Sequence, residues 1–186
     1  RFPDLYVSNL GQPNRLFRNN KDGTFTDVAK DAGVENPTRS FPCWFWDFNN
    51  DGMLDLFVSA FSASISIFAA DFLGLPHKGE VAHLYQGDGE GGFREVAGSQ
   101  RIDRVTLAMG CNFGDLDNDG DDEIVITLNQ ERPVVFSAAG TNVFKQARLL
   151  RGPLLQAPRS VLTDLDLDGD LDLLSISGVT PAYPGL

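Results

Sequence analysis

Acidic side chains recur at alternate positions in three short loops of this 186-residue chain. The loops begin at Asp47, Asp115 and Asp164 and read DFNNDGMLD, DLDNDGDDE and DLDLDGDLD. Each loop has an acid or an asparagine at positions 1, 3, 5 and 9, and a glycine at position 6. Ca²⁺ takes about six to eight hard oxygen ligands, and the glycine permits a sharp turn that a side chain would resist. The pattern therefore predicts three calcium-binding loops.

The predicted ligands are the side chains at positions 1, 3, 5 and 9 and the backbone carbonyl at position 7. In the first loop they are Asp47, Asn49, Asp51, Asp55 and the carbonyl of Met53. In the second loop they are Asp115, Asp117, Asp119, Glu123 and the carbonyl of Asp121. In the third loop they are Asp164, Asp166, Asp168, Asp172 and the carbonyl of Asp170.

Two other interpretations of these loops are weaker. An EF-hand loop begins in the same way, but it needs a glutamate at position 12, where this chain has Val58, Ile126 and Ser175. Solvated acidic turns would also use Asp, Asn and Gly. However, three loops in register keep an acid at position 9, and so many carboxylates in one turn would repel one another without a cation.

The overall charge agrees with this interpretation. The chain has a formal net charge of -11, which makes nucleic acid an unfavourable partner because a phosphate-binding surface needs lysine and arginine. Eleven of its 26 acids stand at the predicted side-chain ligand positions, so three Ca²⁺ ions would reduce the net charge to -5. No run of residues is long and apolar enough to predict a membrane-spanning helix, and no signal peptide is evident.

The loops lie within a longer repeat. Each one connects an apolar stretch to an alternating apolar stretch, which predicts a strand, a tight turn and a second strand. A second hairpin is predicted downstream, because RLFRNNKDGTFTDVA from Arg15 matches HLYQGDGEGGFREVA from His83, with a weaker copy from Val134. The complete unit thus contains four short strands.

The spacing of these signals locates the repeats. Asp4 precedes Leu16 by the same twelve residues that separate Glu123 from Val135, so Asp4 stands at position 9 of a fourth loop. The corresponding distance from Asp55 is 29 residues, which indicates a 17-residue insertion within 61–81. The insertion is predicted to form a short helix or a packed loop, and it is a candidate partner contact.

A unit of about 50 residues with four strands has the size of a β-propeller blade. We therefore expect an all-β fold in which residues 1–186 form one partial β-propeller with almost no helix outside the insertion. The expected blades are a partial one at about 1–33, full ones at 39–100 and 103–150, and a partial one at 157–186. Because a propeller needs about four to eight blades, the chain is expected to be part of a longer protein.

The motifs resemble the FG-GAP/VCBS repeats of the integrin α-subunit propeller. Residues 4–130 resemble still more closely the family of cartilage acidic protein and bacterial ASPIC/UnbV proteins, through DLYVSN, RLFRNNKDGTFTDVA, WDFNNDGMLDLFV and MGCNFGDLDNDGDDE. The resemblance implies structural calcium sites and export from the cell. Two features depart from the family: Glu123 replaces the usual aspartate, and the ASPIC/UnbV domain does not appear in this sequence.

The leading functional hypothesis is a calcium-stabilised, non-enzymatic module that binds a protein or glycan or docks with neighbouring subunits of a complex. Loops of this kind bind Ca²⁺ well where the ion is plentiful, so we expect the protein in the periplasm, at the cell surface or in the extracellular space. One alternative is the propeller domain of a secreted carbohydrate-active enzyme, although no catalytic motif is recognisable. The other is a purely structural assembly subunit.

Overall fold

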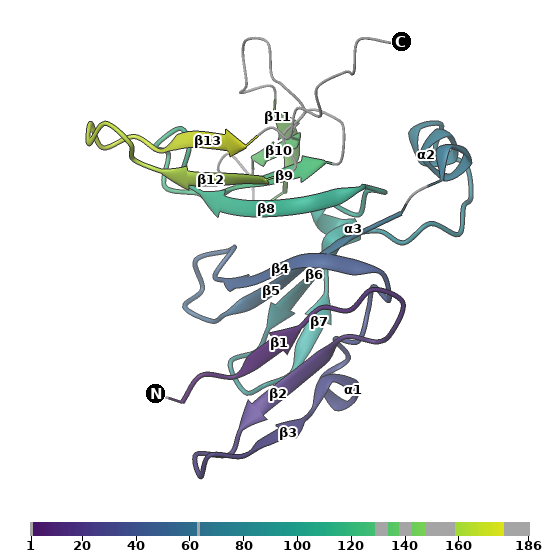
Figure 1. Cartoon of the computed structure of the whole chain (residues 1–186), viewed down its shortest axis with the longest axis vertical. Coiled ribbons are helices and arrows are strands. Elements are labelled where there is room, and N and C mark those ends of the chain that lie inside the picture. Colours follow the sequence, from purple (N-terminus) through teal and green to yellow (C-terminus); the bar gives the residue numbers. More distant parts are fainter. Residues whose placement is uncertain (1, 63, 129–133, 138–142, 148–158, 177–186) are drawn as a thin grey trace, which may run out of the picture.

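The structure is a computed structural model that describes residues 2–62, 64–128, 134–137, 143–147 and 159–176. These residues form four antiparallel sheets that follow one another in chain order along the long axis of the molecule (Figure 1). Sheet 1 contains β1 (Leu5–Val7), β2 (Arg15–Asn19) and β3 (Phe25–Asp27). Sheet 2 contains β4 (Ser40–Trp46), β5 (Asp55–Ala60), β6 (His83–Gly87) and β7 (Phe93–Glu95).

The other two sheets repeat this design. Sheet 3 contains β8 (Ala108–Gly114), β9 (Glu123–Leu128), β10 (Val134–Ser137) and β11 (Lys145–Ala147). Sheet 4 is described for two strands, β12 (Arg159–Thr163) and β13 (Asp172–Ile176). The expectation of an all-β chain with four-stranded antiparallel sheets is confirmed, and the described residues form no closed sheet.

The first two strands of sheets 2, 3 and 4 are joined by the acidic loops. The last paired residues before each loop are Trp46 with Asp55, Gly114 with Glu123, and Thr163 with Asp172. Position 9 of every loop is therefore the first residue of the second strand. The same register places position 12 inside β5, β9 and β13, so the flanking elements are strands, as the exclusion of an EF-hand requires.

Two apolar cores lie between the sheets. Leu56 and Val58 of sheet 2 pack with Tyr6 and Leu16 of sheet 1. Phe57 points to the opposite face of sheet 2 and packs with residues of sheet 3, because alternate residues of a strand face opposite sides. The first strands of sheets 2, 3 and 4, which are edge strands β4, β8 and β12, also contact one another in succession.

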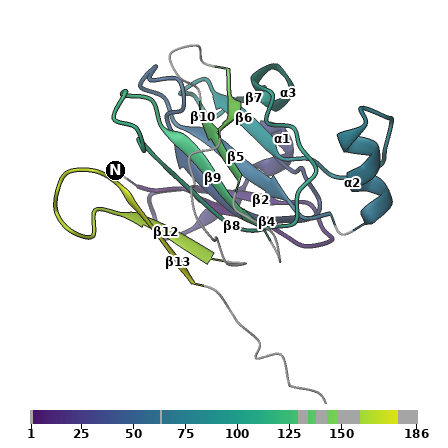
Figure 2. The ribbon, with the colours of Figure 1, turned by 90° about the horizontal axis from the view of Figure 1, so that it is seen from above.

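Within the described ranges, three helices accompany the sheets. Two of them, α1 (Ala29–Ala32) and α3 (Ala97–Gln100), follow the last strands of sheets 1 and 2 and were not expected from the sequence. The third, α2 (Ile65–Phe72), lies in the insertion and stands out to one side of the sheets in both views (Figures 1 and 2). No helix of the described residues is long and apolar enough to cross a membrane.

Candidate metal centres

The aspartate at position 1 organises each loop. Its carboxylate accepts two backbone N–H groups, from positions 5 and 6. The N···O distances are 3.0 and 2.7 Å at Asp47, 3.1 and 3.0 Å at Asp115, and 3.2 and 3.1 Å at Asp164. Short polar side chains commonly stabilise turns in this way. The carboxylate is thus held at the mouth of the loop by the loop's own backbone.

The aspartate at position 5 stabilises the second half of each loop through a hydrogen bond to the backbone. Asp51, Asp119 and Asp168 each accept the N–H of position 7 at 2.9–3.0 Å. The backbone then turns through positive φ at the glycine of position 6, with φ between 84° and 98° in the three loops. Position 4 also has positive φ in every loop, which the sequence pattern did not reveal.

The acid at position 9 reaches back across each loop. Asp55, Glu123 and Asp172 accept the N–H of position 2 in their own loop at 3.0, 2.8 and 3.0 Å. Because position 9 begins the second strand, this bond attaches the loop to the sheet. The three loops therefore share one backbone design, although their sequences differ at several positions.

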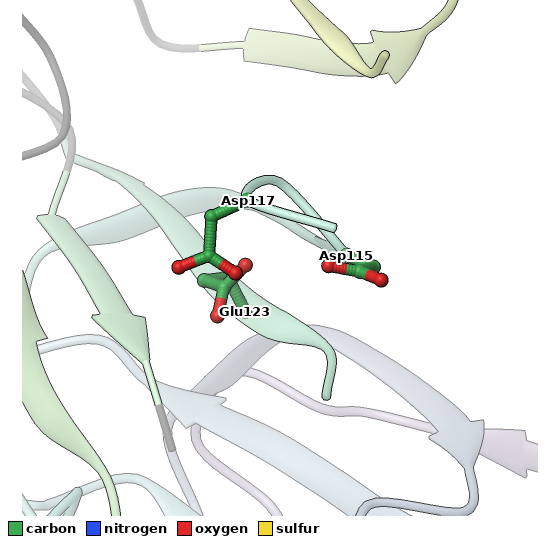
Figure 3. A group of neighbouring side chains, drawn as sticks. All are labelled: Asp115, Asp117 and Glu123. Carbon is green, nitrogen blue, oxygen red and sulfur yellow. The ribbon is translucent and has the colours of Figure 1, made fainter. Parts of the chain in front are cut away.

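Two of the loops bring three carboxylates together. Oxygen atoms of Asp115, Asp117 and Glu123 lie within 4.8 Å of one another, and those of Asp164, Asp166 and Asp172 do the same. Figure 3 shows Asp117 extending from its loop toward Glu123 at the start of β9, with Asp115 beside them. These two groups could hold a metal ion.

The Glu123 carboxylate has an additional feature that favours a cation. Its Oε2 accepts the N–H of Leu116, whereas its buried Oε1 has no hydrogen-bond partner in the part of the chain that the structure describes. Burial raises the pKa of Glu123 above its usual value, against the lowering effect of the Leu116 N–H; the nearby Ser137 hydroxyl also lowers it, although it does not reach hydrogen-bond geometry with Oε1. An unpartnered buried carboxylate oxygen is costly, and a bound Ca²⁺ would satisfy it. The residues of this loop fit the ion.

The first loop differs in the role of its position-9 acid. Each oxygen of Asp55 accepts a backbone N–H, since Oδ2 accepts from Phe48 at 3.0 Å and Oδ1 accepts from Gly87 at 2.8 Å. The amide of Asn49 at position 3 donates to Asp51. Asp47, Asp51 and Asp55 do not form a three-carboxylate group of the kind found in the other two loops. Asp55 therefore joins its loop to the end of β6 through the backbone, and its role as a ligand of the first loop remains a prediction.

The structure does not bring the remaining predicted ligands into a carboxylate group, and it does not exclude them as ligands either. Asp119 and Asp168 lie in their loops but outside the two carboxylate groups. The carbonyl ligands of Met53, Asp121 and Asp170 remain predictions. One contact was missed by the sequence pattern: Asn118 donates to Asp170 at 2.7 Å and links the loops of sheets 3 and 4. Its partners are 52 residues apart, so local spacing gives no sign of it.

The chain is a repeat protein, because antiparallel sheets follow one another and an acidic loop joins the first two strands of sheets 2, 3 and 4. Residues 1–58 match the FG-GAP-like repeat family. Over 97% of its length the chain is also similar to cartilage acidic protein 1, with 28% identity to the proteins of Homo sapiens and Mus musculus and 25% to that of Xenopus tropicalis. The expected resemblance is thereby confirmed. The chain spans 27% of the length of these relatives.

Proposed function

We propose that this chain is a calcium-stabilised, non-enzymatic interaction module, built from FG-GAP-like repeats that form part of a β-propeller and working outside the cell. The observation that carries the calcium assignment is the second loop. There, three carboxylates converge within 4.8 Å and one buried oxygen of Glu123 has no hydrogen-bond partner among the described residues. A divalent cation is the simplest species that neutralises the group and satisfies the oxygen.

The role proposed for calcium is structural. All side-chain ligands of one site come from nine consecutive residues that join two paired strands. An ion held there fixes the first hairpin of a sheet, and five or six protein oxygens leave little room for a reacting molecule. A catalytic metal, by contrast, keeps an open coordination position that faces a cleft.

Three observations support the propeller and its role in binding. Sheets 2 and 3 share the same four-strand order, the first strands β4, β8 and β12 contact one another in succession, and large apolar cores join neighbouring sheets. Such an arrangement makes a rigid scaffold that presents loops for protein or glycan partners, or for neighbouring subunits of a complex. The name of the relatives, cartilage acidic protein 1, supports an extracellular setting for this chain.

Calcium-dependent stability tests the proposal. Thermal unfolding is measured in about 10 mM CaCl₂ and in a chelator, because an ion that binds only the folded state raises the unfolding free energy by about 2.7 kcal/mol at a hundredfold excess over a Kd of about 10⁻⁴ M. We expect a higher Tm in calcium and saturable heat on calorimetric titration. The Asp115→Asn/Asp117→Asn variant should lose much of the difference, whereas Asp31→Asn, a charge-matched change in α1, should retain it.

An unchanged Tm after chelation, together with no heat on titration, would refute the calcium assignment. The interaction role has a separate test, which is capture of purified protein or uncharged glycan ligands by the immobilised chain. Turnover of such a ligand in place of reversible binding would contradict the non-enzymatic role.

A further inference from the structure

A hydrogen bond joins the acidic loops of sheets 3 and 4. The side-chain amide of Asn118, at position 4 of the second loop, donates to Asp170 Oδ1, at position 7 of the third loop, with an N···O distance of 2.7 Å. Asn118 directly follows Asp117, which belongs to the second carboxylate group and extends toward Glu123 (Figure 3). Neither the Asn118 amide nor the Asp170 carboxylate is a predicted ligand. The bond therefore connects two candidate metal centres through side chains that are free of a predicted ligand role.

Two further contacts keep these loops next to each other. A Cβ added to Gly114, directly before the second loop, would lie 2.7 Å from Leu171 Cδ1, so position 8 of the third loop packs where Gly114 has no side chain. In the adjoining strands, Asn112 Nδ2 donates to the backbone carbonyl of Ser160. Strands β8 and β12 thus lie side by side and hold the two hairpins in a fixed relation (Figure 1).

The junction between sheets 2 and 3 is built differently. Trp46 stands before the first loop in the position that Gly114 has before the second, and its ring centroid lies 5.5 Å from that of Phe113. Asn50 has the position of Asn118 in the first loop and the same left-handed backbone, with φ values of 56° and 58°. Within the described ranges, the Asn50 side chain makes no bond of this kind to the second loop. Aromatic packing therefore joins these two sheets at the place where a bond between loops joins sheets 3 and 4.

The third loop is held less firmly by its own residues than the other two. Its position 4 is Leu167 with a φ of 62°, a left-handed conformation that is costly for a residue with a Cβ. The hydrogen bonds from the backbone to Asp164, at 3.2 and 3.1 Å, are the longest of their kind in the three loops. Such a loop gains order from a contact that a neighbour supplies.

We propose that Asn118 couples the second and third loops, so that a Ca²⁺ ion bound by the second loop raises the affinity of the third loop for its own ion. The inference rests on the calcium assignment made above. Ion binding by Asp117 restrains the backbone beside Asn118, and the amide then remains against Asp170. The third loop is ordered before its own ion binds, so it loses less conformational entropy on binding. Because coupling between binding sites is reciprocal, an ion in the third loop also favours binding in the second.

Two opposing effects set the size of this coupling. A hydrogen bond to a carboxylate is stronger than one between neutral groups, but Asn118 and Asp170 are both exposed to water, which weakens it. We therefore expect the affinity to change by about three- to fivefold. Repulsion between the two bound ions acts in the opposite direction, and salt at about 0.15 M screens it over about 8 Å. The coupling should accordingly decrease when the salt concentration is lowered.

Hydrogen exchange measured by mass spectrometry during a calcium titration tests the coupling, because it reports on each loop separately. The quantity measured is the CaCl₂ concentration that gives half of the full protection of residues 164–172 in the intact chain. Asp115→Asn/Asp117→Asn, which disables the second loop, should raise this concentration about three- to fivefold. Asn118→Gly should raise it by a similar factor, since glycine accepts the left-handed backbone and removes the amide without changing the charge.

Two comparisons separate the coupling from a general loss of order. Asn50→Gly makes the same substitution at the equivalent position of the first loop, and it should leave the half-protection concentration of the third loop unchanged. When Asn118→Gly is already present, adding Asp115→Asn/Asp117→Asn should raise that concentration little further. The two changes are then not additive, as expected for residues that act through one connection.

The possible outcomes distinguish the coupling from the calcium assignment. If calcium protects both loops and Asn118→Gly leaves the half-protection concentration of the third loop unchanged, the coupling is overturned and the calcium assignment stands. An equal shift in Asn50→Gly would also overturn the coupling, because a general effect of glycine would account for both results. Absence of calcium-dependent protection in the second and third loops would overturn the calcium assignment and the coupling together.

Discussion

At position 4 of the acidic loops, the three loops share a backbone conformation that suits some side chains better than others. Position 4 has positive φ in all three loops, and it is occupied by Asn50, Asn118 and Leu167. Asparagine tolerates this left-handed conformation better than leucine, whose Cβ approaches the following carbonyl. Leu167 also gains little from packing, because it is 86% exposed. The third loop therefore carries local strain that the first two avoid.

We expect Leu167→Asn to stabilise the chain by about 1 kcal/mol, since it relieves an unfavourable φ of 62° without removing a buried contact. Urea unfolding in a chelator measures the change without a contribution from bound ions. The reverse substitution at the matched position, Asn50→Leu, should destabilise by a similar amount. If both variants unfold at the same urea concentration as the unmodified chain, backbone strain at position 4 does not limit stability.

A second effect at the residue scale concerns His83. Burial lowers its pKa, against the raising influence of Glu95 and Glu80, and its ring stacks on Tyr85 with centroids 5.4 Å apart. A folded-state pKa below the unfolded value means that the unfolded chain binds the proton more tightly. The contribution of neutral His83 to stability is therefore present above its unfolded pKa of about 6.5 and is lost as the pH falls through the folded pKa.

His83→Gln should accordingly reduce the loss of Tm between about pH 7 and pH 5. The comparison is the slope of Tm against pH for the variant and the unmodified chain, because carboxylate titration is common to both. His77→Gln provides a control with the same change of side chain. A steeper slope in the His83 variant than in the unmodified chain would contradict the burial effect.

At the scale of the element, position 9 shows that equivalent acids serve different purposes. Asp55 joins its loop, β5 and the end of β6 through two backbone N–H groups, and burial raises its pKa despite these bonds. Glu123 makes only the loop bond and keeps one buried oxygen without a hydrogen-bond partner among the described residues. The longer glutamate thus suits an ion-dependent hairpin, and the aspartate suits a hairpin held by the backbone.

This difference predicts two distinct responses to calcium. Asp55→Asn should destabilise by about 1–3 kcal/mol in calcium and in chelator alike, because a donor replaces one acceptor of a buried N–H. Glu123→Gln should mainly reduce the gain in Tm that calcium produces. Differential scanning calorimetry of both variants under the two conditions separates the cases. Equal calcium gains in all three proteins would show that Glu123 is not a ligand.

The short helices α1 and α3 could not be predicted from the hydrophobic pattern of the sequence. Just before α1 and α3 a valine follows the last strand, and its N–H donates to the carbonyl of Leu16 in β2 or of Leu84 in β6. Four residues are too few to show a helical period, so no sequence pattern predicts them. Ala29 and Ala97 are nevertheless buried, because each helix covers the edge of a core.

At the scale of the whole molecule, position in the stack of sheets decides which apolar residues are buried. Leu5 and Leu56 are equivalent in the repeat, since each follows a position-9 aspartate. Leu56 is fully buried against sheet 1, whereas Leu5 is 54% exposed on the outer face of sheet 1. Val7 and Val58 differ in the same direction, at 36% and 0% exposed.

Truncation of this matched pair should give very different results. Leu56→Ala should cost about 2–5 kcal/mol, the range for a leucine whose removal leaves a cavity in a packed core. Leu5→Ala should change stability by less than about 0.5 kcal/mol, as is usual for exposed positions. Chemical unfolding of both variants measures the contrast. Comparable losses would show that the outer face of sheet 1 is covered in solution.

The sequence by itself determined the hairpins, the acidic loops and the repeat, because strand alternation, turn chemistry and ligand spacing act over a few neighbouring residues. It also indicated the resemblance that the comparisons confirm. Only the tertiary structure decided that Asp55 is satisfied by Gly87, that Glu123 keeps an unpaired oxygen among the described residues, and that Leu5 is exposed where Leu56 is buried. Those outcomes depend on which strand or sheet lies opposite a residue, and neighbours far apart in the chain leave no trace in local spacing.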